Sequence, residues 1–374
     1  MLGNTFGRLF RITSCGESYG DAMMIILDGM PAGIRITDAD VQKDLDRRRP
    51  GTSPLDSPRQ ETDQVKIVSG MLEGCTTGAP LGMIIYNVDR HQIHVDQYRQ
   101  KKDLHRPGHA ELTYYVKYGD SFDWCGAGRA SGRETVGRVA AGAVAKLLLA
   151  RESIEVVGYV KELYGIKSRP MPFDQIKANL LKTKISCPDL EAAQKMIEAT
   201  LKVKEEGDTV GGIIEVIARG VPAGLGEPAY DKISATIAHG LMSIPAVKGI
   251  EFGAGFELAR MKGSQANDIP YVENGKIKFR TNHAGGVLGG ITNGDDLVLR
   301  VVVKPTSTIS IPQETINMVK MENTKLAAIT RRDPTICGRA VVVCEAVVAI
   351  CIVDHLMMAR GYEAVQKLDK PFKI

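Results

Sequence analysis

The chain has 374 residues, of which 44% are hydrophobic and 25% are charged, as is typical of soluble globular proteins. Its net charge of +4 at pH 7 is small and aromatic residues make up only 5%, so the composition does not favour a nucleic-acid-binding protein. The sequence contains no run of about eighteen uncharged apolar residues, and its N-terminus lacks the apolar segment and cleavage site of a signal peptide. We therefore expect a cytoplasmic protein that is not associated with a membrane.

The seven cysteines are scattered along the chain, odd in number and without a Cys-x-x-Cys pair. This usage predicts reduced thiols, and neither a disulfide framework nor a structural zinc site. Cys337, Cys344 and Cys351 are spaced seven residues apart in a helical stretch. They therefore share one helix face, where small residues of this kind are expected in the core.

Short runs rich in valine and isoleucine predict strands, and longer periodic or apolar runs predict helices. The predicted strands are residues 65–68, 82–86, 154–160 and 297–303, and the predicted helices are residues 38–48, 133–151, 190–203, 231–242 and 338–360. The chain is therefore expected to be an α+β protein with long helices.

Three of the predicted helices begin with a recognisable signal. Thr37 or Asp38 can cap the first helix. Ser131 and Glu134 form the Ser-x-x-Glu pattern of a capping box before the second. Asp333-Pro334 precedes the last helix, and we expect the proline near the first helical position.

An internal repeat links two distant parts of the chain. Residues 23–37 (MMIILDGMPAGIRIT) and 213–227 (IIEVIARGVPAGLGE) both run from an apolar strand into Gly-x-Pro-Ala-Gly and then into a predicted helix. The recurrence predicts one domain over residues 1–374, built from two related β-turn-α halves of roughly residues 1–200 and 201–374.

Basic residues gather at turns and not along helix faces. The clusters are residues 47–49, residues 101–102, Arg129 with Arg133, and residues 331–332. Each cluster alone is better explained by a solvated surface patch. Together they indicate a pocket for a polyanionic small molecule.

Residues 124–135 (WCGAGRASGRET) place three glycines before a predicted helix. Free backbone amides and the positive end of the helix dipole attract anions, and Arg129 and Arg133 add fixed charge. The stretch is neither a Walker loop nor a Gly-x-Gly-x-x-Gly fingerprint. It predicts an anion site or, alternatively, an ordinary helix entry.

Residues 104–111 (LHRPGHAE) carry His105 and His109 four positions apart. That spacing would suit two metal ligands on a helix, but Pro107-Gly108 between them breaks a helix, so no metal site is predicted. A histidine held on such a turn beside Arg106 is a better candidate for acid–base chemistry near an anion. A surface loop histidine is the alternative.

Two further stretches contain candidate ligand groups. Residues 282–296 are rich in glycine and lead through a strand to residues 304–310 (KPTSTIS), whose lysine and hydroxyls can hold a phosphate or a ribityl chain. A glycine-rich hairpin with a polar strand end is the alternative. In residues 330–335 (TRRDPT), Asp333 is most simply a helix cap.

Taken together, these stretches resemble the chorismate synthase family. The resemblance is collinear over nearly the whole chain and rests on GES.G at 16–20, DLDRRRPG at 44–51, RPGHA at 106–110, GRASGRET at 128–135, GVPAGLGEP at 220–228, SIPAVKG at 243–249, NHAGG.LGGI.NG at 282–294, KPTS at 304–307 and RRDP at 331–334. Each motif alone is moderately specific, whereas nine in the same order leave little room for another family.

The resemblance implies a β-α-β sandwich fold and a homotetramer. It implies a lyase (EC 4.2.3.5) that converts 5-enolpyruvylshikimate-3-phosphate to chorismate, the last common step of the shikimate pathway. The reaction is a 1,4-anti elimination of phosphate that requires reduced FMN without net redox change. Some relatives reduce the flavin with NADPH, but this sequence shows no dinucleotide fingerprint, which favours an external reductant.

The resemblance also assigns residues. It implies His109, Asp333 and Tyr19 as catalytic, His109 near flavin N1 and Asp333 near flavin N5. The implied substrate-binding residues are Arg48, Arg106, Arg133, Arg331 and Ser18. The implied FMN contacts are Arg129, Ala130, Ser131, Pro245, Ala246, Gly289, Lys304, Pro305, Thr306, Ser307, Thr308 and Arg331.

Three positions depart from the family pattern. Tyr19 stands where the family usually has the histidine thought to protonate the departing phosphate, Pro54 stands at an anion-binding arginine position, and Arg332 replaces a common histidine. A phenol with a pKa of about 10 is a weaker acid than imidazolium, so we hypothesise a slower phosphate departure. A diverged paralogue with altered activity and a non-catalytic flavin-binding scaffold are the alternatives, although His109, Asp333 and the arginines argue against the scaffold.

Overall fold

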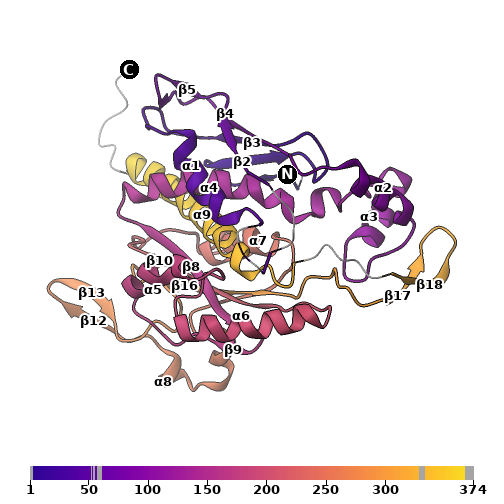
Figure 1. Ribbon diagram of the computed structural model, residues 1–374. Coiled ribbons are helices and arrows are strands. Elements are labelled where there is room, and N and C mark those ends of the chain that lie inside the picture. The colour runs from indigo at the N-terminus through magenta and orange to yellow at the C-terminus, as the bar shows by residue number, and fades with distance from the viewer. Residues whose placement is uncertain (1–2, 52, 54, 57–60, 328–332, 367–374) are drawn as a thin grey trace.

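The computed structural model describes residues 3–51, 53, 55–56, 61–327 and 333–366, with side chains as far as residue 361. Pro54, Arg331 and Arg332 lie outside the described residues. Figure 1 shows two β-sheets on either side of a layer of helices. The predicted α+β class is therefore confirmed, with the long helices between the sheets.

Both large sheets have five strands and are antiparallel throughout. The first follows the order β1 (Thr5–Phe6), β2 (Arg11–Cys15), β3 (Ala22–Asp28), β7 (Leu81–Tyr86) and β4 (Val65–Ile67). The second follows the order β11 (Val247–Phe252), β16 (Leu297–Val303), β10 (Gly212–Arg219), β8 (Glu155–Leu163) and β9 (Ile166–Lys167). The four predicted strands are β4, β7, β8 and β16, each within a few residues of its predicted bounds.

Alternation along the strands directs one face of each sheet to the helical layer. In β3, Met23, Ile25 and Leu27 are buried, whereas Met24 and Ile26 between them are exposed. A strand with period two can bury only one face when its sheet is covered on that side alone. The second sheet is also covered on its outer face, where α5 (Phe173–Asn179) packs over Val157 and Tyr159.

The helices occupy three places in Figure 1. The layer between the sheets holds α1 (Asp38–Arg48), α4 (Thr135–Ala150), α7 (Ile233–Met242) and α9 (Cys337–Gln366). Beyond the second sheet lie α5 and α6 (Leu190–Glu205), and to one side lie α2 (Gln92–Lys101), α3 (Glu111–Tyr118) and the hairpin of β17 (Gln313–Asn317) and β18 (Glu322–Leu326). The smaller elements are β5 (Met71–Leu72), β6 (Cys75–Thr76), α8 (Gly263–Ala266), β12 (Pro270–Glu273), β13 (Lys276–Phe279), β14 (Val287–Leu288) and β15 (Ile291–Thr292).

Helix α9 is the central core helix. Residues Cys337–Gly361 are long and apolar enough to cross a membrane, with a mean hydropathy of 2.2, but 83% of the most apolar window is buried inside the protein. Cys337, Cys344 and Cys351 are all buried, as predicted. Packing between the sheets therefore accounts for the apolar character of α9.

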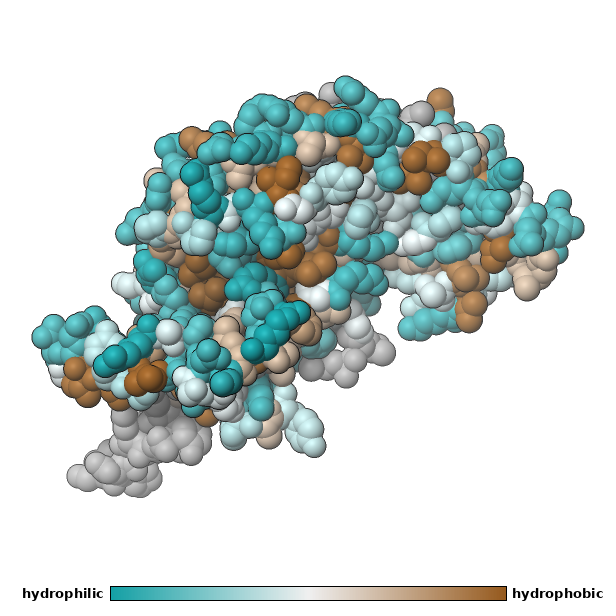
Figure 2. All heavy atoms as spheres, turned by 90° about the horizontal axis from the view of Figure 1, so that it is seen from below, coloured by the Kyte–Doolittle hydropathy of each residue, from teal (hydrophilic) through white to brown (hydrophobic). Residues whose placement is uncertain are grey.

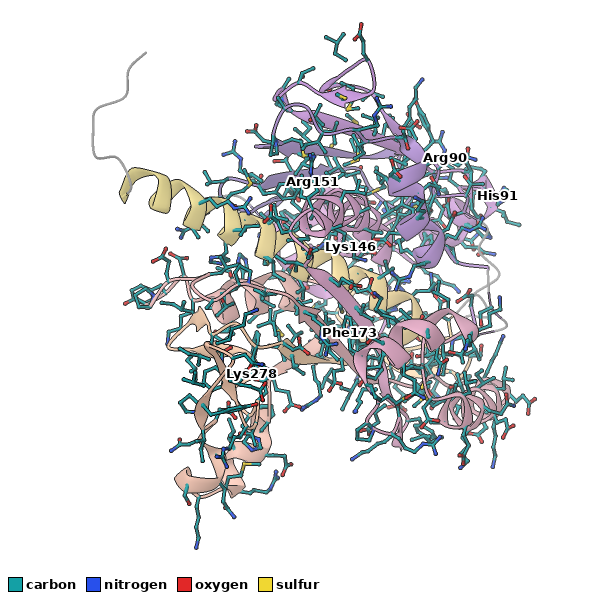
Figure 3. All side chains as sticks on the ribbon, turned by 90° about the vertical axis from the view of Figure 1, so that its left-hand side faces the viewer. Arg90, His91, Lys146, Arg151, Phe173 and Lys278 are labelled. Carbon is teal, nitrogen blue, oxygen red and sulfur yellow. The ribbon has the colours of Figure 1, made fainter. Side chains whose placement is uncertain are left out.

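A charged cluster fastens this core helix to its neighbours. Glu345 of α9 is almost fully buried and accepts hydrogen bonds from Arg47 of α1 and Lys146 of α4; Figure 3 labels Lys146 within the helical layer. Burial alone would raise the pKa of the Glu345 carboxyl, but the two cations lower it to about 2. The three helices therefore share one buried ion cluster.

Two of the predicted helix starts require correction. Thr37 caps α1 with a complete capping box to Asp40, as its residue type predicts. Ser131 accepts only from the Arg133 amide, while the Glu134 carboxylate turns away to Ser14 and Arg138. Because that carboxylate neutralises side chains of other elements, the predicted capping box is wrong. Pro334 lies three residues before the first residue of α9, so its predicted place at the helix start is wrong as well.

The internal repeat recurs in three dimensions. Strands β3 and β10 are each the middle strand of a five-stranded sheet, and each leads through Gly-x-Pro-Ala-Gly into a helix of the central layer. One hydrophobic core cluster contains residues from Phe10 to Val353, and the single domain stays a prediction. The second sheet also takes β8 and β9 from before residue 201, so the sheets do not divide at the predicted boundary. The relation of the two halves stays a prediction.

The surface is hydrophilic over most of the face seen from below. Figure 2, seen from below, shows mainly hydrophilic residues with hydrophobic ones in small, separate patches. A projecting hairpin of β12 and β13 extends from the body, with Lys278 labelled on it in Figure 3. Several of its side chains, such as Val272 and Ile277, are exposed.

Candidate active site

One cavity of about 750 Å³ gathers most of the residues that the sequence singles out. Six segments far apart in the chain meet there: residues 18–19, 106–110, 126–135, 242–248 and 304–308, and residues 333–343 at the start of α9. Every described residue assigned to catalysis or to the substrate lines it, namely Ser18, Tyr19, Arg48, Arg106, His109, Arg133 and Asp333.

The described residues assigned to FMN line the same cavity with one exception. Those present are Arg129, Ala130, Ser131, Pro245, Ala246, Lys304, Pro305, Thr306, Ser307 and Thr308. Gly289 instead lies in the turn between β14 and β15, outside the cavity, and Arg331 lies outside the described residues. The site therefore combines both predicted residue sets but does not include Gly289.

Asp63 holds two cavity arginines side by side. Its Oδ2 accepts from Arg48 Nη1 at 2.7 Å, and its Oδ1 accepts from Arg133 Nη1. The carboxylate is fully buried. Burial alone would raise its pKa, but Arg48 and Arg133 hold the pKa below its usual range. Asp63 therefore stays charged and balances one of the two guanidinium charges.

Other bonds fix the orientation of these guanidinium groups. Arg48 donates to the Gly132 carbonyl at 2.8 Å and to Thr135 at 3.2 Å, and Arg133 donates to Asn87 Oδ1 at 2.7 Å. Both arginines are more than nine-tenths buried. We call Arg48, Asp63 and Arg133 the arginine wall; it is preorganised for an anion because its charges are set before any ligand arrives.

Arg106 is held by a second carboxylate. Glu111 at the start of α3 accepts from Arg106 Nε at 2.6 Å and also from Nη2. The guanidinium carbon lies 5.3 Å from the centroid of the Tyr98 ring, within the range of a cation–π contact. These contacts fix the orientation of the Arg106 guanidinium, for which an anion-binding role is predicted.

His109 is neutral in this environment. Burial, followed by the positive charges of Arg106 and Lys304 and by His105, lowers the pKa of His109 from 6.5 to about 3. Its Nε2 lies 2.8 Å from Thr308 Oγ1. At pH 7 the ring can therefore exchange a proton but does not itself carry a positive charge.

Lys304 and the hydroxyls after β16 form a second wall, which we call the lysine wall (residues 304–308). Lys304 Nζ donates to the Gly108 carbonyl at 3.0 Å and to Ser307 Oγ. Burial, together with the nearby Lys248, lowers the pKa of Lys304. A Cβ at Gly108, where φ is +76°, would lie 2.7 Å from Ser307 Oγ, so this close approach requires glycine.

Arg129 and Asp333 form hydrogen bonds and an ion pair within the protein that the sequence does not predict. Arg129 donates to the Gly16 carbonyl at 2.9 Å and to Ser14 Oγ at 2.7 Å, tying its turn to the end of β2. The Asp333 carboxylate pairs with Arg339, and its carbonyl accepts from Thr306 at 2.7 Å. Asp333 thus joins the lysine wall to the start of α9.

Tyr19 is held in place by contacts with its ring. The ring meets that of Tyr98 edge-on, with centroids 5.5 Å apart. A Cβ at Gly126 would lie 2.6 Å from the Tyr19 ring, and Gly126 has a φ of +62°. Only glycine therefore fits opposite the phenol.

Sequence reasoning missed several residues of the site. Among them are Glu61, Asp63, Tyr98, Glu111, Arg138, Lys248 and Arg339. Arg339 had a usable signal, because a cation at the start of a long apolar run is costly unless it is paired. Asp63 had none, since its partners are 15 and 70 positions away.

The cavity carries a surplus of positive charge. Eight lysine or arginine side chains line it, compared with three aspartate or glutamate side chains. Among the described residues, no group of three or more His, Cys, Asp or Glu side chains is arranged to hold a metal ion. The lining therefore suits a ligand with several negative charges.

Comparison with known proteins identifies the family to which the chain belongs. A family model described as chorismate synthase matches residues 10–357. The chain belongs to the chorismate synthase family. It is 53% identical to the chorismate synthase of Acetivibrio thermocellus, over 98% of this chain and 97% of that one. It is 51% identical to the chorismate synthase of Methanosarcina barkeri, over 96% and 97%.

A solved structure has a similar fold. The protein described as "Crystal Structure of Chorismate Synthase" superimposes with a TM-score of 0.77 at 30% identity, over 96% of each chain. The resemblance inferred from the nine motifs is therefore confirmed. As a member of this family, the chain is an enzyme of the lyase class (EC 4.2.3.5) in the shikimate pathway.

Proposed function

We propose that this cavity converts 5-enolpyruvylshikimate-3-phosphate to chorismate by 1,4-anti elimination of phosphate, with reduced FMN bound beside the substrate. The observation that carries the proposal is the excess of eight cations over three carboxylates in one cavity, in a chain of this family. The substrate has one phosphate and two carboxylates, and such a lining balances that charge.

The arginine wall supplies the strongest anion contacts. Arg48 and Arg133 are fixed by Asp63 and by backbone and amide oxygens, so they lose little freedom when an anion binds. As the carbon–oxygen bond to phosphate breaks, negative charge grows on the leaving group. Guanidinium groups already in position stabilise that charge without reorganising.

The residues present fit a flavin. The lysine wall offers one cation and several hydroxyls for a phosphate and a ribityl chain, and Met242, Ile244, Pro245 and Ala246 offer an apolar surface for a flat ring. When bound, reduced FMN supplies electron density to the substrate transiently and recovers it, so that no net redox change occurs. Lys304, Ser307 and Thr308 are the residues that would hold it.

Proton handling falls to three side chains. His109, neutral and 2.8 Å from Thr308, gains affinity for a proton when an anion enters the cavity, because the anion offsets Arg106 and Lys304. Asp333 lines the cavity with its carboxylate paired to Arg339, and this carboxylate can accept a proton. Tyr19 can donate a hydrogen bond from its phenol to the departing phosphate.

An anaerobic assay for chorismate with photoreduced FMN, with and without NADPH, tests the proposal. Chorismate formed from photoreduced FMN without NADPH supports it, and no chorismate from oxidised FMN with NADPH would support external flavin reduction. FMN binding without phosphate release would instead identify a non-catalytic scaffold. Phosphate release only from a related phosphorylated cyclohexene acid would identify a diverged paralogue.

We further propose that the protein acts in the cytoplasm as a homotetramer, on the ground of family membership. Sedimentation equilibrium of the purified chain measures the assembly. A monomer at micromolar concentration would contradict this part of the proposal while leaving the reaction untouched.

A further inference from the structure

A smaller side chamber of about 110 Å³ adjoins the main cavity. Four residues line both spaces, namely Tyr19, Tyr98, Arg106 and Thr308. The remaining wall comes from α2 and the turn after it, with two residues from elsewhere: His94, Gln97, Lys101, Lys102, Leu104, Glu111 and Trp124. The side chamber and the main cavity therefore lie on either side of these four residues.

The charge of the side chamber is positive. Its lining includes Lys101, Lys102 and Arg106, and Glu111 is its one acidic side chain among the described residues. Glu111 is already paired with Arg106, so this carboxylate does not balance the lysines. Neither lysine forms an ion pair within the part of the chain that the structure describes. A small anion would supply the missing charge.

The size of the side chamber selects its occupant. A cavity needs only roughly 10–15 Å³ to hold one water, so 110 Å³ accommodates several waters or one tetrahedral oxyanion. A cyclohexene ring with an enolpyruvyl ether and a phosphate needs far more room. The main cavity, at about 750 Å³, provides that room. The two spaces thus differ in what they admit.

We propose that the side chamber binds inorganic phosphate as it leaves the main cavity, with Arg106 contacting the ion in both spaces and Lys101 and Lys102 holding it next to solvent. This inference rests on the proposed function, which releases phosphate beside Tyr19. Lys101 is half-buried and Lys102 is exposed, so the path leads outward. Phosphate that moves into the chamber frees the arginine wall for the next substrate, and release of product often limits turnover.

The proposal has a kinetic signature. Inorganic phosphate in the side chamber coexists with substrate in the main cavity, so phosphate inhibits with a noncompetitive component. Phosphate bound only at the arginine wall would be purely competitive with the substrate. In the double variant K101Q/K102Q, the noncompetitive component is lost while kcat/KM for the substrate stays within about twofold of the parent, because neither lysine lines the main cavity.

Calorimetric titration of the full chain with inorganic phosphate tests the site without turnover. We expect two classes of site in the parent, one of them weakened at least about tenfold in K101Q/K102Q, which corresponds to 1.4 kcal/mol. The matched control is K66Q/K276Q, which removes two exposed lysines outside both spaces and should keep both classes. Thermal unfolding of each variant checks that the fold is intact.

The outcomes separate the two proposals. A single class of phosphate site in the parent, or two classes unchanged by K101Q/K102Q, overturns the side-chamber site. Purely competitive inhibition in the parent overturns it as well. Two classes of site in a chain that forms no chorismate would contradict the proposed function and leave the side chamber standing.

Discussion

The arginine wall and the lysine wall face the same cavity but are built differently. Arg48 and Arg133 are almost fully buried and share one buried carboxylate. Lys304 is half-buried and is held by a carbonyl and a hydroxyl, and no carboxylate of the described residues is among its hydrogen-bond partners. A buried cation needs a fixed counter-charge, whereas a partly hydrated one does not. The first wall is therefore rigid before binding, and the second can adapt to its ligand.

The largest expected effect comes from removing the shared carboxylate. Asp63→Ala leaves the buried Arg48 guanidinium without its carboxylate partner and Arg133 with Glu61 at 3.6 Å, and the free energy of unfolding should fall by about 3–5 kcal/mol. Urea denaturation measures it. The matched control is Asp28→Ala, which breaks the exposed pair with Arg11 and should cost under about 1 kcal/mol.

A milder change tests the positioning role of Asp63. Asp63→Asn keeps the shape of the side chain but removes its charge, so we expect a higher KM for the substrate and a smaller change in kcat.

For the comparison of Asp63→Ala with Asp28→Ala, equal losses of the free energy of unfolding would show that the arginine wall is not a buried ion cluster.

Tyr19→His tests the weak acid in the cavity that Arg48 and Arg133 also line. If the phenol limits phosphate departure, an imidazole there should raise kcat by about 10²-fold or more, the usual gain from general acid catalysis. Steady-state chorismate formation measures the change. Unchanged turnover would show that position 19 does not limit this step.

Gly126→Ala tests how tightly the Tyr19 ring is held. The new Cβ would lie 2.6 Å from that ring, whereas the Cβ of Gly33→Ala, also at positive φ, meets nothing within 4 Å. Backbone strain alone should cost about 1–2 kcal/mol in either variant. Only Gly126→Ala should lose more than this and also slow turnover. Thermal unfolding and turnover of the two variants provide the comparison.

His109, which contacts the lysine wall through Thr308, should make stability depend on pH. The folded chain keeps it neutral down to a pKa of about 3, whereas the unfolded chain takes up the proton near 6.5. Its contribution to the free energy of unfolding is thus complete above pH 6.5 and declines on acidification, by at most about 1.4 kcal/mol per pH unit. Between pH 7 and pH 5 the parent should lose more stability than His109→Asn. Parallel losses would contradict the burial of a neutral ring.

The smallest expected effect is on the lysine wall. Lys304→Gln should weaken FMN binding by about tenfold, or 1.4 kcal/mol, because one charged donor is lost. Its free energy of unfolding should change by under about 0.5 kcal/mol, the usual range for a substitution without a buried partner. Flavin fluorescence titration and urea denaturation measure the two quantities. A stability loss as large as that of Asp63→Ala would contradict the conclusion that the lysine wall, unlike the arginine wall, does not depend on a buried charge pair.

Local patterns in the sequence were sufficient for much of the fold. Residues 38–48 and 297–303 form α1 and β16 with the bounds that their capping signal and apolar pattern predict. Such signals act between neighbours in the chain, so they can be recognised without the fold. The capping box predicted from Ser131 and Glu134 does not form, because the Glu134 carboxylate accepts hydrogen bonds from Ser14 and Arg138 instead. Ser14 and Arg138 belong to other elements, so a local sequence pattern does not predict these contacts.

The sequence alone determined the family, the residue types of the site and most of the segments that carry them. Only the tertiary structure decided that Asp63 joins Arg48 to Arg133, that His109 is neutral, that Gly289 lies outside the cavity and that Lys101 lines a separate chamber. The physical reason is that charge interactions depend on distance and on the exclusion of water. Both are properties of the folded chain, and neither follows from the order of its residues.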